Sequence, residues 1–509
     1  MSTVQIVKGH THADLGVTPN TYVSSVVGDF IRSTLTEYSV IFNKKTFRKV
    51  YTVLGKYATF DMSTNILHIP IGFVPILKTT LQNRGINVKE FYMTDYPVRR
   101  ISMSTLPEWK DQDHQVPLIE KCSSLVKGMK GLSAQTGKGK TYCAIRAICN
   151  LGQAAVVIAP GLADQWIDSF EKFTGERDSV YKIQEFKSLD ILMRSDWMPK
   201  VFVCSIQTMQ AYSKGRDNYK LLPYSFKKFF EHYGIGVKVI DECHLNFHAT
   251  VKMDLITNVP YNIYCSATFG QTNKYAARIF DVVYPKSIRF GEDDYDRYVT
   301  VHFFNYSGEV SENKCVRQRG YSHMRYEMQL LKKVTKFENH FNELFVPIIS
   351  MFYINTRQPG DKMLIFCSTI AFIEKVAEKI RHTWPDLNVV EYVGDATKDM
   401  LTDADIIVAT VGKAGTGLDI KGLTVVYSTV SIRTSILSSQ MLGRLRKING
   451  KNLVYVDRCD ANLHSHRRHA EERKANLKSM AAKFYEYSHM HDVEPRIFLP
   501  DGTLGTVTA

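Results

Sequence analysis

The chain has 509 residues, of which 44% are hydrophobic and 23% are charged. This composition is typical of a globular protein, and the length predicts about three or four domains. A formal net charge of +14 suits a polyanionic partner such as a nucleic acid. The longest apolar run, residues 344–354, is too short to cross a bilayer, and the nine cysteines form no C-x-x-C pair. We therefore expect a cytoplasmic protein with reduced thiols and no membrane partner.

The first 104 residues are expected to form a small domain of strands and helices. Short β-rich runs come first, and an amphipathic helix follows with Val74, Leu77 and Leu81 on one face. Gly85 is the expected cap of this helix, and the next residues read as a last strand. Between residues 44 and 57, basic side chains alternate with aromatic ones. Such a stretch either follows a nucleic-acid backbone and stacks on bases or forms a solvated face, and both interpretations stay open.

Residues 134–141 read A-Q-T-G-K-G-K-T, which is the pattern of a phosphate-binding loop. Gly137 and Gly139 let the backbone turn its N–H groups towards a polyphosphate. Lys140 places a positive charge at the β- and γ-phosphates, and Thr141 offers a hydroxyl to Mg²⁺. The first position is alanine where such loops usually have glycine. The predicted ATP-binding residues of this stretch are Ala134, Gln135, Thr136, Gly137, Lys138, Gly139, Lys140 and Thr141.

A glutamine and an acidic pair accompany this loop. Gln115 lies 19 residues before Ala134, at the start of an expected helix, and its amide can pair with N6 and N7 of adenine. An expected strand at residues 237–240 ends in Asp241, which can hold Mg²⁺ beside the phosphate loop. The next carboxylate, Glu242, is placed to orient and deprotonate an attacking water.

Polar residues also follow several other expected strands. At the carboxyl edge of a parallel sheet, such side chains can reach a phosphodiester backbone or link it to the nucleotide site. The candidate residues for nucleic-acid contact and coupling are Thr208, His244, Ser266, Thr268, Thr369 and Thr410.

A second series of alternating strands and helices begins at residue 363, with no second phosphate loop. Gly417 allows close backbone approach, and Asp419 can bind a ribose hydroxyl or position an arginine. Residues 440–447 read Q-M-L-G-R-L-R-K, and arginines offered to a γ-phosphate by a neighbouring domain act as arginine fingers. The candidates there are Gln440, Arg444 and Arg446, with Lys447 as the alternative to Arg446.

Taken in order, these stretches resemble the motifs of superfamily-two helicases. Gln115 matches the adenine-reading glutamine of that superfamily. The segments A-Q-T-G-K-G-K-T, D-E-C-H, S-A-T, G-T-G-L-D-I and Q-M-L-G-R-L-R-K match motifs I, II, III, V and VI. D-E-C-H differs from the D-E-A-D of the RNA-helicase branch and is similar to UvsW-like phage DNA helicases, which are related to XPB-like enzymes. The I-P-I-G-F segment at residues 69–73 and the basic tail helix add to that likeness.

The resemblance implies an α/β protein with two tandem RecA-like domains and one site for ATP and Mg²⁺. The expected parts are an α+β accessory domain at 1–104, RecA-like domains at 105–290 and 336–460, a connector at 291–335 and a helical tail at 461–509. The resemblance further implies an ATP-dependent helicase that acts on forked or branched DNA in phage replication, recombination or repair. It would work in the host cytoplasm, with replication or recombination proteins as candidate partners.

Three other functions stay open at this point. A double-strand translocase would move along DNA without separating strands, and an RNA helicase would be stimulated by RNA instead of DNA. A non-hydrolysing clamp on branched DNA would have no need of Glu242, so the presence of that carboxylate argues against the clamp.

Overall fold

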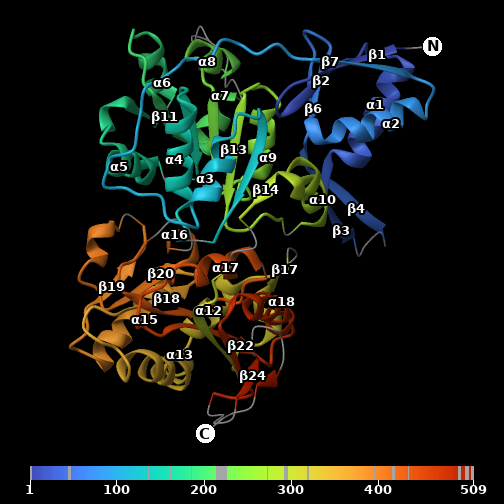
Figure 1. Ribbon diagram of the computed structural model, residues 1–509. Coiled ribbons are helices and arrows are strands. Elements are labelled where there is room, and N and C mark those ends of the chain that lie inside the picture. The colour runs from blue at the N-terminus through green and yellow to red at the C-terminus, as the bar shows by residue number, and fades with distance from the viewer. Residues whose placement is uncertain are drawn as a thin grey trace. The chain divides into compact units, whose positions relative to one another are not determined.

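The computed structural model describes residues 3–43, 48–135, 137–160, 163–184, 186–213, 226–271, 273–291, 296–317, 320–394, 396–414, 419–433, 435–490, 495–498 and 504–505. Its internal contacts divide the chain into two units, Met1–Asp294 and Tyr295–Ala509 (Figure 1). None of the helices in the described ranges combines the length and the apolar character that crossing a bilayer requires.

The first unit begins with a mixed sheet in the order β5-β6-β2-β1-β7. The helix α1 starts at a capping box made by Thr21 and Ser24, and α2 buries the predicted face of Val74, Leu77 and Leu81. The elements of this module are β1 (Thr3–Lys8), β2 (His12–Gly16), α1 (Tyr22–Thr34), β5 (Thr59–Asp61), β6 (Ile66–Pro70), the short helix η1 (Ile71–Phe73), α2 (Val74–Gln82) and β7 (Asn87–Tyr92).

An antiparallel hairpin of β3 (Thr36–Asn43) and β4 (Arg48–Lys56) is inserted into this module. Its strand β4 exposes Tyr51, Val53 and Leu54, whereas Tyr57 directly after it is buried. Part of the predicted basic and aromatic stretch, residues 44–47, lies outside the described residues.

The rest of the first unit is a parallel seven-stranded sheet in the order β10-β11-β9-β12-β13-β8-β14. Strands buried on both faces need a continuous apolar run, and Ala155–Ala159 of β9 is such a run. The strands are β8 (Gly128–Ser133), β9 (Ala155–Ala159), β10 (Val180–Ile183), β11 (Val201–Ser205), β12 (Val237–Ile240), β13 (Tyr261–Ser266) and β14 (Arg289–Phe290). The helices are α3 (Val116–Ser123), α4 (Lys140–Leu151), α5 (Ala163–Thr174), α6 (Phe186–Met193), α7 (Ile206–Ser213), α8 (Phe226–His232), α9 (Phe247–Asp254) and α10 (Lys274–Val283).

The two faces of this sheet belong to different hydrophobic cores. Ala155, Val157 and Ala159 pack in one core with α4 and α5, whereas Val156 and Ile158 pack in the other. The second of these cores also contains the apolar residues of the N-terminal mixed sheet. The N-terminal module and the parallel sheet therefore share one core.

The second unit is built on a nine-stranded sheet in the order β19-β20-β18-β21-β22-β15-β23-β24-β25, parallel except for its last two strands. The two large parallel sheets confirm the predicted α/β class with RecA-like domains. The strands are β15 (Val299–Tyr306), β18 (Lys362–Cys367), β19 (Val389–Tyr392), β20 (Ile406–Thr410), β21 (Leu423–Ser428), β22 (Leu453–Asp460), β23 (Lys483–Tyr487), β24 (Arg496–Phe498) and β25 (Leu504–Gly505). Its helices are α11 (Glu312–Cys315), α12 (His323–Leu331), α13 (Val334–His340), α14 (Val346–Ile349), α15 (Ile370–Thr383), α16 (Val411–Ala414), α17 (Ser435–Leu442) and α18 (His464–Met480).

Two segments of the second unit differ from what the sequence suggests. Residues 291–335, expected to be a connector, contain β15, which pairs with β22 on one side and β23 on the other. The tail from residue 461 contains not only the expected helix, α18, but also β23, which extends the same sheet. Partners distant in sequence complete the pairing of both strands, so the local sequence does not show which sheet they join.

Candidate nucleotide site

The phosphate-binding loop joins the end of β8 to the start of α4. Gly137 and Gly139 have φ values of 96° and 82°, a backbone region that glycine adopts at little cost. The Lys140 Nζ donates to the carbonyl oxygen of Ala134 at 2.8 Å, so the side chain folds back over the loop. Ala134 is buried, and its amide donates to the Ser266 carbonyl at the end of β13. Residue 136 lies outside the described residues.

Gln115 packs directly against this loop from the residue that precedes α3. Its Oε1 accepts from the amide of Gln112 at 3.1 Å, and its Nε2 donates to the Lys138 carbonyl at 3.5 Å. A Cβ atom on Gly139 would lie 2.3 Å from the Gln115 Nε2. Glycine suits this position because its φ lies in the left-handed region, and a Cβ there would also require the Gln115 amide to shift.

Asp241 and Glu242 follow β12 at the same edge of the sheet. The Asp241 Oδ2 accepts from the indole N–H of Trp166 at 3.0 Å, and its Oδ1 accepts from the Glu242 amide. Desolvation, with the nearby Glu242 charge as a second cause, raises the pKa of Asp241 to about 6. Lys140 acts in the opposite direction on the same carboxyl, so the loop lysine lies within electrostatic reach.

Glu242 adopts an unusual backbone conformation for a residue with a side chain. Its φ is 47°, in the left-handed region that costs non-glycine residues about 1 kcal/mol or more. Its Oε2 is buried without a hydrogen-bond partner among the described residues and lies 3.4 Å from His244 Nδ1. The backbone therefore presents a carboxylate oxygen that has spare capacity to accept a proton.

His244 connects this pair to the end of the next strand. Its Nδ1 lies 2.7 Å from the Ser266 hydroxyl, which in turn bonds the amide and carbonyl of Thr268. Gln271 donates to the His244 carbonyl at 2.5 Å. Burial lowers the pKa of His244 to about 4, so the imidazole is neutral at physiological pH.

The remaining predicted residues of the first unit occupy the same carboxyl edge. Thr141 lies in the first turn of α4 and is partly exposed. Thr208 lies after β11, where its hydroxyl and amide both bond the Ser205 hydroxyl. The parallel sheet thus brings the loop, the acidic pair and the hydroxyl residues to one edge, as the order of strands β11, β12, β13 and β8 requires.

The predicted residues of the second unit come from several elements, with Gln440 in α17 and Arg444 just after it. Arg444 and Gln440 are both buried, and the Arg444 Nε donates to the Gln440 carbonyl at 3.3 Å. Arg446 pairs with Asp419 at 3.4 Å, and Lys447 pairs with Asp296 at 2.8 Å. Gly417 lies outside the described residues. Thr410 ends β20, and its hydroxyl accepts from the Lys413 amide.

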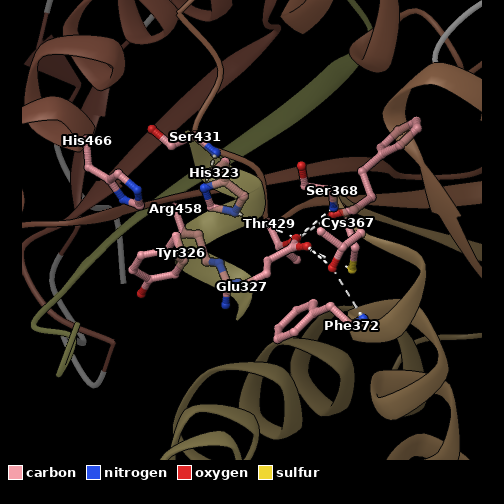
Figure 2. Close-up of polar contacts among 12 residues, drawn as sticks. His323, Tyr326, Glu327, Cys367, Ser368, Phe372, Thr429, Ser431, Arg458 and His466 are labelled. Carbon is pink, nitrogen blue, oxygen red and sulfur yellow. Dashed lines mark hydrogen bonds and ion pairs between the residues drawn. The ribbon is translucent and has the colours of Figure 1, made fainter. Parts of the chain in front are cut away.

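Sequence reasoning missed a buried carboxylate that holds the start of α15. Glu327 of α12 accepts from the Ser368 amide at 2.6 Å and from the Thr369 hydroxyl at 2.7 Å (Figure 2). The same Thr369 hydroxyl accepts from the amide of Phe372 and so caps the helix. Burial raises the pKa of Glu327 to about 7, although both hydrogen bonds act against that rise. No motif points to this residue, because it lies in the expected connector.

A family match adds to this geometry. Residues 110–271 match the family model described as type III restriction enzyme, res subunit. The chain carries a superfamily-two helicase ATPase domain. The matched residues of this helicase domain include Gln115, the phosphate loop, the acidic pair and the S-A-T segment, and binding of ATP follows from the family.

Two solved structures are similar to this chain. The crystal structure of T4 UvsW is 13% identical with a TM-score of 0.35, and the match covers 96% of this chain and 99% of that chain. The structure of S. cerevisiae Dbp5 bound to RNA and ADP BeF3 is 14% identical with a TM-score of 0.49, covering 75% of this chain and 91% of that chain. A search among curated proteins found no match.

Proposed function

We propose that the protein is an ATP-driven DNA helicase or translocase that acts on branched DNA, at forks and Holliday junctions. The observation that carries the hydrolytic part is the acidic pair after β12. One carboxylate, Asp241, is held by Trp166, while the other, Glu242, keeps a buried oxygen free of hydrogen bonds in the described structure. A pair with one fixed and one available carboxylate suits a metal ligand beside a general base.

In this proposal the loop residues 134–141 hold the ATP phosphates, and Lys140 leaves the Ala134 carbonyl to contact the β- and γ-phosphates. Gln115 reads adenine after it leaves the Lys138 carbonyl. The left-handed glycines and the absence of any Cβ at Gly139 fit a polyphosphate cradle.

Thr141 and Asp241 are the residues that would hold Mg²⁺, because both offer oxygen atoms at the carboxyl edge of the sheet. When bound, the ion neutralises the charge that develops on the phosphates. Glu242 accepts the proton of the attacking water through its unpaired Oε2. The left-handed backbone at Glu242 is held in place by its amide, which donates to the Asp241 Oδ1 at 3.0 Å.

From the second unit, we propose that Gln440 and Arg444 complete the hydrolytic site and that Arg446 is the second arginine finger. Arg446 is favoured over Lys447 because a guanidinium group makes the bidentate contact that an ammonium group cannot. Asp419 then acts as the residue that positions Arg446, to which it already pairs. Thr208, Thr268, Thr369 and Thr410 are proposed to contact the nucleic-acid backbone, with His244 and Ser266 relaying the contact to the acidic pair.

ATP hydrolysis by the full chain tests this function. The rate is measured without polymer and with single-stranded DNA, forked DNA or RNA. We expect forked DNA to give the largest stimulation, and we expect Lys140→Ala and Glu242→Gln to abolish it. Glu242→Gln should still bind a fluorescent ATP analogue, because only its proton acceptor is lost. Lys182→Ala removes an exposed amine that pairs with Asp164 at 2.5 Å, and it serves as the control with normal activity.

The same panel separates the competing functions. Stimulation by RNA alone would replace the DNA assignment by an RNA helicase. No hydrolysis under any condition would favour the non-hydrolysing clamp. If DNA stimulates hydrolysis, a forked duplex with one labelled strand distinguishes a helicase, which releases the strand, from a translocase, which only displaces a protein bound to the duplex.

A further inference from the structure

The outer face of the N-terminal mixed sheet carries two histidines and an aspartate that converge on one point. His12 and Asp14 lie on the same face of β2, two residues apart, and His68 is the direct partner of Asp14 on β6. Ala13, between these two residues, and Leu15, directly after Asp14, are fully buried in the core on the other face. The strand register therefore fixes the three polar side chains next to one another.

The three ligating atoms lie close enough to share one ion. The His68 Nδ1 is 2.5 Å and the His12 Nε2 is 3.5 Å from the same oxygen, Asp14 Oδ1, and all three atoms lie within 4.8 Å of one another. Ligands at about 2.0–2.1 Å around a tetrahedral zinc ion lie about 3.3 Å apart. The His12–Asp14 separation is already close to this value, and a small rotation of the Asp14 carboxylate would open the contact with His68.

The surroundings of His12 direct its lone pair towards this point. The Thr11 hydroxyl donates to the backbone carbonyl of Asp254 at 2.9 Å, so its oxygen is available to accept from His12 Nδ1 at 3.5 Å. With the proton on Nδ1, the unprotonated Nε2 faces the Asp14 carboxylate. In this tautomer two acceptors face each other in a site where His12 is 4% exposed, and a cation bound between them would offset their repulsion.

We propose that His12, Asp14 and His68 bind a divalent transition-metal ion of the zinc type, with a water completing a tetrahedral site. Two imidazoles and one carboxylate form a ligand set that zinc uses, and the nitrogen donors select against Mg²⁺ and Ca²⁺. The ion clamps β2 to β6. Because Thr11 bonds the carbonyls of Asp254, which ends α9, and of Thr257, the clamp also fixes the turn that docks the N-terminal module on the parallel sheet. This inference does not depend on the proposed DNA activity.

Metal binding to the full-length protein, freed of metal by dialysis against a chelator, tests the site. Zinc is titrated by calorimetry with Mg²⁺ in excess, and Co²⁺ is used to report the ligand set by its visible spectrum. We expect one ion per chain with tetrahedral cobalt bands. Asp14→Asn and His68→Gln should each weaken binding by more than about ten-fold, because each removes a ligand while keeping a similar shape.

The chain offers a matched control in the same module. His10 Nε2 lies 2.6 Å from the Asp95 carboxylate, and no third ligand joins them within the described residues. His10→Gln should therefore leave zinc affinity unchanged. Zinc should also raise the melting temperature of the wild type and of this control but not that of Asp14→Asn. Equal zinc affinity in the wild type and both ligand variants, no stoichiometric binding, or a sulfur-to-cobalt charge-transfer band would each overturn the proposal.

Discussion

At the scale of single residues, Ser266 is the junction between the acidic pair and the segment after β13. Its side chain is fully buried, and its one hydroxyl contacts His244 and both backbone groups of Thr268. A change at Thr268 therefore reaches His244 by hydrogen bonds, and His244 Nδ1 lies 3.4 Å from Glu242 Oε2. We propose that this short relay lets a nucleic acid bound at the sheet edge be sensed at the proposed hydrolytic site.

Ser266→Ala tests the relay. We expect DNA-stimulated ATP hydrolysis to fall about five- to ten-fold, equivalent to about 1–1.4 kcal/mol, because the hydrogen bonds of one hydroxyl are lost. Hydrolysis without DNA should fall less. Ser169→Ala removes a hydroxyl that bonds only the preceding turn of α5, so it should change neither rate. An equal loss of the basal and stimulated rates in Ser266→Ala would contradict a relay.

A second residue-scale prediction concerns Glu327 and pH. Its pKa is raised from 4.5 to about 7, so between these values the folded protein keeps the carboxyl protonated while the unfolded chain ionises it. The stability of the second unit should accordingly fall as pH rises through this window. Glu327→Gln removes this dependence, and thermal melts from pH 4 to 8 of wild type and variant measure the difference.

The control for that experiment is Glu378, whose pKa is shifted in the opposite direction. A hydrogen bond from Lys375 lowers the pKa of the exposed Glu378. This ion pair therefore adds stability as pH rises, but screening by solvent makes its contribution small. Glu378→Gln should leave the pH profile of the wild type nearly intact. A parallel pH profile for Glu327→Gln and the wild type would show that Glu327 is ionised in the fold.

At the scale of elements, α18 is held to the second sheet by a buried ion pair. The guanidinium group of Arg473 bonds both oxygens of Asp457 in β22, at 2.9 and 3.1 Å, and both side chains are 1% exposed. Arg473 also donates to the backbone carbonyls of Ile432 and Arg458. The basic helix of the tail therefore has one arginine that points into the protein.

Arg473→Met should destabilise the second unit by about 3–5 kcal/mol, because it leaves the Asp457 carboxylate buried and unpaired. Arg468→Met, on the exposed side of the same helix, should cost about 0–1 kcal/mol. Hydrogen exchange of the α18 and β22 amides measures the loss of stability in both variants. Similar protection in the two variants would mean that packing, and not the ion pair, holds the helix.

Local patterns predicted some elements well and failed for others, for physical reasons. The phosphate loop and β12 could be predicted because the glycine, lysine and acidic residues that follow these strands form motifs within a short stretch of sequence. β15 could not, because its partners, β22 and β23, come from residues far along the chain. The contact of Gln115 with Gly139 and the hydrogen bond from Ser368 to Glu327 could not be predicted either, since each depends on a side chain meeting a distant backbone.

At the scale of the whole molecule, the N-terminal module is part of the first unit and shares its core. Gly72 of η1 shows how close the contact is, because a Cβ on it would lie 2.2 Å from the backbone oxygen of Val282 in α10. Tyr57 adds a ring contact with Phe247, at 5.1 Å between centroids. The segment I-P-I-G-F thus needs glycine for docking and not for a turn.

Gly72→Ala should separate the module from the parallel sheet. We expect a loss of about 1–3 kcal/mol in the first unit and faster proteolysis between residues 92 and 105, because backbone atoms must shift to admit the methyl group. Gly16→Ala places a methyl group where nothing lies within 4 Å, so it should be nearly neutral. Unchanged proteolysis in Gly72→Ala would show that the interface can adapt without opening.

The position of β15 has a consequence for synthesis of the protein. This strand is the first sheet segment of the second unit to leave the ribosome, yet both of its neighbours, β22 and β23, are among the last to be made. The nascent strand must wait with both edges unpaired while the whole of the intervening domain emerges. The first unit can fold during translation, but the sheet of the second unit is completed only when the chain is nearly finished. Until then the unpaired edges of β15 can aggregate or bind chaperones.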